Sequence, residues 1–469
     1  MLPLVEIPEI VRHYESFFTE VFSPAALEQF KRYVSGLIVS DNKTVEGINR
    51  LFVFDVRHQS SLNRLLTESP FSISKLHQAR LALLSSIPQT QMKRKGVLSI
   101  DDTLLTHYGQ HFEKITPLYD SVHQCYVWAH NLVNLHYSDD DTDYPVDFAL
   151  WEPTDVDALE KGLVAAGRSL RESKYSLKQS DPKKWRSYLV GVWRRHQHKP
   201  AVGALYQSKL HLAQHLLAQF VANYPDQNLP VTFDSWYTQP AFCRYVDKTL
   251  KRAYVGTLDG DARVKLTSGE HPLSIFDQSL QARHQAAIEA GKQPLFKKLS
   301  ITYKGEKEHY YSYCKTHRIA TFGKQRLVIN HQKADLSDPP RLFISNRLNW
   351  QAGGITRIRR HRWPVEVYHE KGKAEGLDQY QVRDFEAIKK HIALVTVTYS
   401  LLRAAQHDRV LLQKLQQHIE TTLGGSVPTA RRITQAQALW ALATFTATAL
   451  AQGQSLQQIM QPVLATLTY

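Results

Sequence analysis

The chain has 469 residues, of which 43% are hydrophobic and 22% charged, so it can form several packed units and is not a disordered polymer. Its 58 Lys and Arg against 44 Asp and Glu give a formal net charge of +14, which favours a polyanionic partner such as nucleic acid. The three cysteines, Cys125, Cys243 and Cys314, are too scattered for a disulfide framework or a cysteine zinc site.

No stretch reaches the roughly 18 consecutive apolar residues that a membrane helix needs. The N-terminal segment also lacks a basic stretch followed by an apolar run. We therefore expect a protein that is neither exported nor membrane-spanning, located in the cytoplasm.

The first region, residues 1–92, shows helical spacing of apolar residues from about residue 8 to 90. Ser23 before Pro24 is typical of a helix cap followed by a first turn. We interpret this region as a helical DNA-binding domain, although its basic residues are equally compatible with a solvated surface. These basic residues are Lys31, Arg32, Lys43, Arg50, Arg57, Arg64, Lys75 and Arg80.

The second region, residues 93–258, predicts a mixed α/β unit in which two apolar strands each end in a carboxylate. Val97–Ile100 is followed by Asp101 and Asp102, and Leu229–Phe233 is followed by Asp234. The other expected strands are Val122–Trp128, Leu132–Tyr137 and Ala253–Leu258, and the expected helices are Asp155–Glu172, Ala204–Tyr224 and Gln239–Thr249. The acidic run Asp139–Asp143 has no glycine or closing glutamate at calcium-loop spacing, which favours a solvated loop.

The remaining chain divides into three further units. Residues 259–350 alternate in polarity and predict an inserted, mainly β domain with one helical piece near Asp277–Gly291. Residues 351–406 return to helix, with Trp363–Glu375 and Phe385–Gln406, and residues 407–469 form a C-terminal helical region.

A third acid, Glu366, is expected beside Asp101 and Asp234. Pro364 suits a first helical position, which places Glu366 in the first turn of a helix. Lys373 follows seven residues later on nearly the same face, because seven steps of about 100° almost complete two turns. Three carboxylates from different elements can hold two divalent ions for phosphodiester chemistry, and Arg359, Arg362 and Lys373 can bind phosphates. Asp102 competes with Asp101 as the first ligand, and Asp234 can also serve as a helix cap.

The sequence resembles the DDE transposases of bacterial insertion sequences, in the insertion-sequence-4-like superfamily and closest to the insertion-sequence-701 kind. The resemblance rests on FKRYVSGLI and HQSSLNRLLTES near the N-terminus, on LSIDDTLLTHYG and VTFDSWY at the two aspartates, and on RHRWPVEVYHEKGKAEGLDQYQVRDFEAIKKH around Glu366. The family's third motif places Tyr, Arg, Glu and Lys at fixed spacing. Arg362, Glu366 and Lys373 fit it, whereas Arg359 stands where the family has Tyr.

That resemblance implies a ribonuclease H-like core, interrupted by the inserted domain, with Asp101, Asp234 and Glu366 holding two Mg²⁺ ions for which Mn²⁺ can substitute. It implies a homodimer that binds the terminal inverted repeats and target DNA, in a bacterial cytoplasm and on the nucleoid when bound. Trp350, at the end of the insert, becomes a base-stacking candidate, with a core role as the simpler alternative.

Two other functions stay open at this point. A domesticated descendant would bind DNA without cutting it, and a nuclease would cut without joining. The three acids favour an enzyme, and a strand-transfer assay with pre-cut ends separates the three possibilities.

Overall fold

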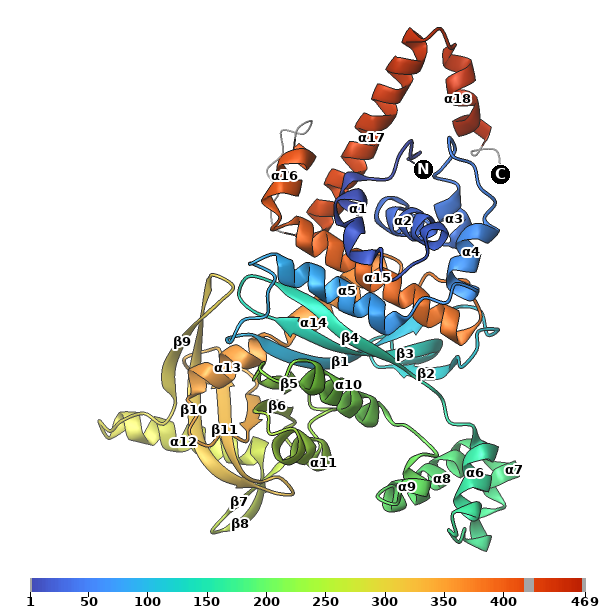
Figure 1. The fold of residues 1–469 in the computed structure, drawn as a ribbon. Helices are drawn as coiled ribbons and strands as arrows, with labels where there is room; N and C mark the ends of the chain where they lie inside the picture. Colours follow the sequence, from blue (N-terminus) through green and yellow to red (C-terminus); the bar gives the residue numbers. More distant parts are fainter. Residues whose placement is uncertain (1, 417–425, 466–469) are drawn as a thin grey trace.

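The computed structural model describes residues 2–416 and 426–465, and it shows a mixed α/β architecture built on one twelve-stranded sheet (Figure 1). The main strand order is β2-β3-β1-β5-β6-β12-β11-β10-β7-β8, with β4 also paired to β3 and β9 to β10. β1, β5 and β6 run parallel, whereas the other pairings are antiparallel. Among the described residues, no helix has the length and apolarity needed to cross a membrane.

The first half of the sheet contains six strands. They are β1 Val97–Thr106, β2 Thr116–Asp120, β3 Cys125–Ser138, β4 Asp143–Trp151, β5 Val231–Phe233 and β6 Tyr254–Leu258. β1 does not end before the aspartates as expected, because its antiparallel pairing with β3 continues to Thr106. The two strands expected within residues 122–137 are one long strand, β3, since β1 and β4 pair along it without interruption by a turn.

The inserted region, residues 259–350, continues the same sheet rather than forming a second one. Its strands are β7 Arg263–Leu266, β8 Gly269–Pro272, β9 Lys297–Tyr303, β10 Glu306–Ile319, β11 Gly323–His331 and β12 Arg341–Ser345, with helix α12 Leu273–Glu289 between β8 and β9. The mainly β character is as predicted. The join is made by β12, which pairs with β6 over four residues.

Helices cover both faces of the sheet (Figure 1). The N-terminal elements are α1 Glu9–Tyr14, a 3₁₀ turn Glu15–Phe18, α2 Pro24–Val39, α3 Val45–Asn49, α4 Ser60–Thr67 and α5 Ile73–Ser86. With α15 Phe385–Ala405 they lie above the strands, while α10 Lys209–Asn223 and α11 Pro240–Arg244, extended by a π-helical turn Tyr245–Thr249, lie below. Ser23 caps α2 by accepting a hydrogen bond from Ala26, as its position before Pro24 predicted.

A group of short helices between β4 and α10 was only partly expected. It contains α6 Val156–Ala165, a 3₁₀ turn Glu172–Lys174, α7 Leu177–Ser180, α8 Pro182–His196 and α9 Pro200–Gly203. The sequence predicted a single helix over residues 155–172, but α6 ends at Ala165 and Gly167 follows with a positive φ of 69°.

The last part of the chain is helical. It comprises α13 Ala352–Arg360, α14 Trp363–Ala374, α15, α16 Arg409–Gln416, α17 Val427–Ala451 and α18 Leu456–Ala465. α17 and α18 project from the top of the molecule as a hairpin (Figure 1). Helix α13 was not expected. Arg359 lies in it, and so in a different helix from Glu366, which lies in α14.

Three of the basic residues proposed as a DNA-facing surface are instead buried. Arg32, Lys43 and Arg80 are 2%, 1% and 0% exposed, so they cannot contact DNA from the N-terminal region. Arg80 donates to the backbone carbonyls of Pro145 and Val146, which fixes α5 to β4. The DNA-binding role of this region stays a prediction that now rests on the other basic residues.

The acidic run Asp139–Asp143 is not simply a solvated loop. Asp139 and Asp143 are buried, and Asp143 accepts hydrogen bonds from Arg403 of α15 at 3.0 Å and from Lys304 of the β9–β10 turn at 2.9 Å. These two cations hold the pKa of Asp143 well below its usual value, against the opposing effect of burial. The carboxylate therefore ties the inserted strands to the rest of the molecule.

Candidate active site

Asp101 and Asp234 lie side by side because of the parallel register of β1 and β5. Ile100 of β1 pairs with Phe233 of β5 at the carboxyl end of the parallel pairing. The residue that follows each of them is an aspartate, Asp101 or Asp234. Ligand sites of open α/β sheets form at this edge. The pairing of β1 with β5 therefore brings the two carboxylates together, as the sequence predicted.

The turn after β5 fixes the carboxylate of Asp234. Its Oδ1 accepts a hydrogen bond from the backbone N–H of Tyr237 at 3.0 Å, and its carbonyl accepts one from Oγ1 of Thr238 at 2.6 Å. Gly256 of β6 lies beneath this turn, where an added Cβ would come within 2.7 Å of Oγ1 of Thr238. Asp234 caps the turn rather than helix α11, which begins only at Pro240.

Asp101 and Asp102 have different partners. Asp102 is held by three donors: Asn131 Nδ2 at 2.6 Å, Tyr237 Oη at 2.8 Å and Lys209 Nζ at 2.9 Å. Asp101 accepts one side-chain hydrogen bond, from Nη1 of Arg362 at 2.6 Å. Both carboxylates line one cleft, and their different hydrogen-bond partners distinguish them.

Arg362 joins Asp101 to Glu366. While Nη1 donates to Asp101, Nη2 donates to Oε1 of Glu366, and the buried Nε has no partner among the described residues. Glu366 lies in the first turn of α14, as expected from Pro364, and Arg362 is the residue before that helix. One guanidinium therefore stands between carboxylates from β1 and α14, which are 265 positions apart in the chain.

The other two proposed phosphate ligands, Arg359 and Lys373, lie on α13 and α14. Arg359 on α13 donates from Nε to Oγ1 of Thr257 at 2.8 Å. Burial, reinforced by the charge of Arg362, lowers the pKa of Arg359 to about 9. Lys373, two turns after Glu366, lines the same cleft as Asp101 and Asp234.

The site concentrates negative charge in a poorly solvated place. Burial is the largest cause that raises the pKa of Asp101 to about 7, with the carboxylates of Asp234 and Asp102 adding to it and Arg362 opposing it. Burial likewise raises the pKa of Asp234. Crowded carboxylates of this kind are stabilised by a nearby cation, and Arg362 supplies one here.

A cleft of about 1070 Å³ opens at this edge of the sheet. We call it the central cleft, and residues that define it include Asp101, Asp102, Asp234, Lys209, Trp236 and Lys373. Lys209 and Trp236 were not foreseen as site residues. Nζ of Lys209 lies 4.0 Å from the centre of the Trp236 ring, and the ring is 43% exposed. The only sequence signal for Trp236 is its position two residues after Asp234.

The donor set fits a hard divalent cation, since carboxylate oxygens are the ligands that Mg²⁺ and Mn²⁺ prefer. The described residues nevertheless contain no ready-made group of three or more metal-binding side chains. Arg362 lies between Asp101 and Glu366. Glu366 itself is 33% exposed at its side chain, so its carboxylate is accessible from solvent.

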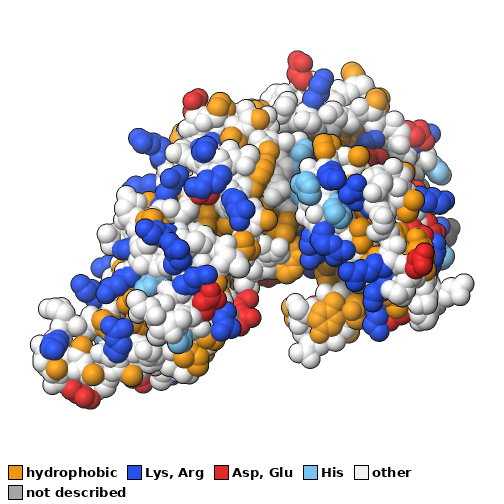
Figure 2. Space-filling view, turned by 90° about the horizontal axis from the view of Figure 1, so that it is seen from below, with side chains coloured by type: hydrophobic (Ala, Val, Ile, Leu, Met, Phe, Trp, Pro, Cys, Tyr) orange, Lys and Arg blue, Asp and Glu red, His pale blue; other side chains and the backbone are white. Residues whose placement is uncertain are grey.

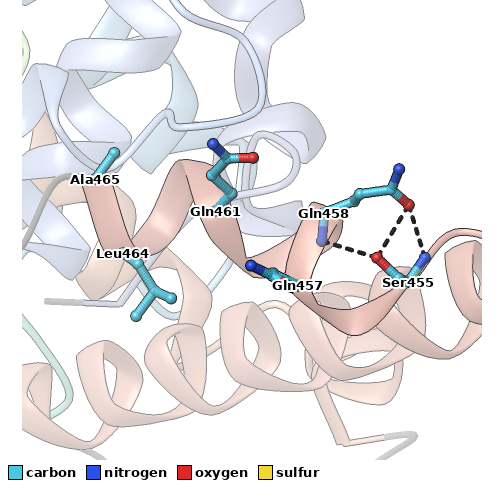
Figure 3. A pocket seen from close by; sticks show the side chains of 6 residues that line it. All are labelled: Ser455, Gln457, Gln458, Gln461, Leu464 and Ala465. Carbon is cyan, nitrogen blue, oxygen red and sulfur yellow. Dashed lines mark hydrogen bonds between the residues drawn. The ribbon is translucent and has the colours of Figure 1, made fainter.

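Two other features lie away from this site. Trp350 packs against the buried cluster of Val97, Val255 and Phe343, and its carbonyl accepts a hydrogen bond from Arg326. A shallow pocket at α18 (Figure 3) is lined by uncharged side chains only, which are Ser455, Gln457, Gln458, Gln461, Leu464 and Ala465. It offers no acid, base or charged metal ligand.

Carboxylates at the carboxyl end of a parallel strand pair in a mixed α/β sheet, with arginines beside them, are an arrangement suited to metal-assisted chemistry on phosphate esters. A family model described as DDE superfamily endonuclease matches residues 17–272, more than half of the chain, and the protein therefore belongs to that family. It is a nuclease-type enzyme whose substrate is DNA, and domains of this family generally use divalent metal ions. A comparison with curated proteins gave no match. The matched range includes Asp101 and Asp234 and ends before Glu366.

Proposed function

We propose that the protein is a transposase of the insertion-sequence-4-like superfamily, of the insertion-sequence-701 kind, which cuts and joins DNA ends by two-metal-ion phosphoryl transfer. The observation that carries the proposal is the junction of Asp101, Arg362 and Glu366 beside Asp234. The strand order β4-β3-β1-β5-β6, with the last three parallel, supports a ribonuclease H-like core.

In this mechanism the chain's own residues position the reacting phosphate. Asp101, Asp234 and Glu366 would supply oxygen ligands for two Mg²⁺ ions. Arg362, Arg359 and Lys373 bind phosphate oxygens on the same side, and Arg362 can do so once it leaves the carboxylates. When bound, the ions would activate the attacking oxygen and stabilise the leaving one.

The reaction consists of two displacements at phosphorus. A water oxygen first attacks the phosphodiester in line, the bond from phosphorus to the 3′-oxygen breaks, and that oxygen leaves as a 3′-hydroxyl. The 3′-hydroxyl then attacks a target phosphate, forms a new phosphodiester bond and releases a target 3′-oxygen. Both steps need the same positioning residues.

The decisive experiment compares two glutamates of α14. Glu366→Gln should lower metal-dependent cleavage of the terminal repeats by at least about a thousandfold while DNA binding survives. Glu370→Gln is the matched control, because the Glu370 side chain is 72% exposed on the same helix. Equal activity of the two variants would remove Glu366 from the site. Joining of pre-cut ends by the wild-type protein distinguishes a transposase from a nuclease, and DNA binding without cleavage or joining would indicate a domesticated descendant.

The proposed acting species is a homodimer on DNA, because two transposon ends must be cut and joined together. The C-terminal hairpin supports a protein–protein contact: the sequence contains no Asp, Glu, Lys or Arg from residue 433 onward, and Leu439 and Leu450 are 59% and 44% exposed. Light scattering with and without the terminal repeats tests this point. Base stacking by Trp350 stays a prediction, and it requires the ring to leave its present packing.

A further inference from the structure

The helices between β4 and α10 form a separate small unit, which we call the helical arm (residues 156–203). It has its own core, built by Leu159, Leu163, Trp185, Leu189, Val192, Trp193 and Val202. In Figure 1 it lies below the sheet, away from the N-terminal and C-terminal helices. Trp193 connects it to α10 through a ring contact with His211 at 5.3 Å, and to the segment before α10 through Tyr206 at 4.9 Å.

The arm is strongly basic for its size. Its sequence has eleven Lys and Arg against four Asp and Glu, so it carries half of the protein's net charge of +14. Some of this charge is neutralised locally, because Lys178 pairs with Glu160 at 2.8 Å and Lys184 with Asp181 at 3.1 Å. Among the described residues, no carboxylate pairs with Arg194 or Arg195 at the end of α8.

One face of α8 borders the central cleft. Val190, Trp193, Arg194 and Gln197 line the same cleft as Asp101 and Asp234, whereas the adjacent Arg195 does not. Figure 2, seen from below, shows the hollow between the lobe of β7–β12 on the left and the arm on the right, with Lys and Arg side chains along the arm's side. The arm thus forms a positively charged wall opposite the acidic residues.

This arrangement answers an electrostatic requirement of the proposed function, on which the inference rests. Asp101, Asp102 and Asp234 repel a phosphate backbone, so the surroundings of the cleft must supply compensating positive charge. We propose that the helical arm is a DNA clamp, and that Arg194 contacts a backbone phosphate of the duplex held in the central cleft. The contact is to the backbone, so it contributes affinity without sequence preference.

Two charge reversals on neighbouring residues test the clamp. Arg194→Glu should weaken binding of duplex DNA about tenfold at low salt and reduce the slope of log affinity against log salt by about one. Arg195→Glu makes the same change in net charge, on the same helix, outside the cleft, and should weaken binding about twofold or less. Circular dichroism of both variants checks that the arm remains folded.

The outcomes separate the clamp from the proposed function. Equal losses for the two variants, or no loss for Arg194→Glu, would overturn the clamp while wild-type cleavage keeps the proposed function intact. If the wild-type protein binds no DNA, the clamp and the proposed function are both wrong. A Gln197→Cys substitution in a Cys125→Ser background gives a second measurement: it should form a disulfide with thiol-modified DNA, and absence of that crosslink contradicts the clamp.

Discussion

Nη1 of Arg362 lies 2.6 Å from Oδ2 of Asp101, and the same guanidinium bonds with Glu366. The side chains of Arg362 and Asp101 are only 11% and 12% exposed, so the positive charge is held where carboxylates crowd together. Arg362 therefore acts as an internal counter-ion to these carboxylates. Metal ions and Arg362 would compete for the same oxygens, which makes this residue the most informative position in the site.

Removing the guanidinium should destabilise the metal-free protein and increase its response to divalent ions. Arg362→Gln leaves Asp101 and Glu366 without the cation that bonds with both, and we expect a loss of about 2 kcal/mol in the free energy of unfolding. Added Ca²⁺ or Mg²⁺ should raise the melting temperature of this variant more than that of the wild type. An identical response to the ions in both proteins would argue against competition between Arg362 and metal.

The two adjacent aspartates should respond differently to amide substitution. Asp101→Asn removes a proposed metal ligand and should abolish cleavage. Because burial raises the pKa of this carboxyl group to about 7, its replacement by a neutral amide should cost little free energy of unfolding. Asp102→Asn weakens charge-assisted bonds from Lys209, Tyr237 and Asn131, and should cost about 1–3 kcal/mol in the free energy of unfolding. Cleavage and denaturant unfolding measured on both variants check this; a cleaving Asp101→Asn would transfer the ligand role to Asp102.

Gly256 should be intolerant of a side chain because of the turn that carries Asp234. In Gly256→Ala the new Cβ would lie 2.7 Å and 2.9 Å from two side-chain atoms of Thr238, and 3.0 Å from Phe233. We expect a loss of about 1–3 kcal/mol and reduced cleavage, as the turn shifts. Thr238→Ala in the same chain should recover part of both, and a double-mutant cycle measures that recovery. Strict additivity would show that the two residues are not coupled.

Acid should destabilise the fold through His391. Its Nε2 donates to the carbonyl of Gly376 and its Nδ1 accepts from Tyr33, which requires a neutral ring, and burial lowers its pKa from 6.5 to about 4. Between these values the unfolded chain binds more protons, so stability is full above pH 6.5 and falls as the pH drops toward 4. The lowered pKa of His391 therefore reduces the free energy of unfolding by about 3 kcal/mol at pH 4.

His391→Gln isolates this contribution, because glutamine can keep one donor and one acceptor without titrating. The variant should lose less stability between pH 6.5 and 4 than the wild type in denaturant titrations. Other buried histidines, such as His361 and His369 with pKa values of about 3, titrate in both proteins and cancel in the difference. Parallel stability curves for the two proteins would show that His391 titrates in the fold as it does in the unfolded chain.

The pairing of Asp101 with Asp234 was predictable because each follows a short apolar segment, which is how buried parallel strands end. The position of Glu366 followed from Pro364 in the same local way. Arg359 was expected in an irregular segment before this helix, but it lies in α13. This helix was not predicted because residues 352–360 are few and carry no clear signal for a helix boundary.

The helical arm and the single continuous sheet were not predictable from local patterns. Apart from α8, the arm's helices are short, and the apolar residues of the arm meet only after the chain folds back on itself. The extension of β1 past Asp102 depends on partners in β3, and the junction of β6 with β12 depends on residues about ninety positions away. Such pairings are set by tertiary context rather than by sequence periodicity.

That junction limits how the protein can be shortened. Val255 and Gly256 are paired with β5 on one side and with β12 on the other, so they are interior positions of the sheet. A protein from which residues 259–350 had been deleted would expose the backbone N–H and C=O groups of β6 to other molecules, and such open edges promote aggregation. A smaller version of this enzyme would therefore have to keep the inserted strands, even if they never touched DNA.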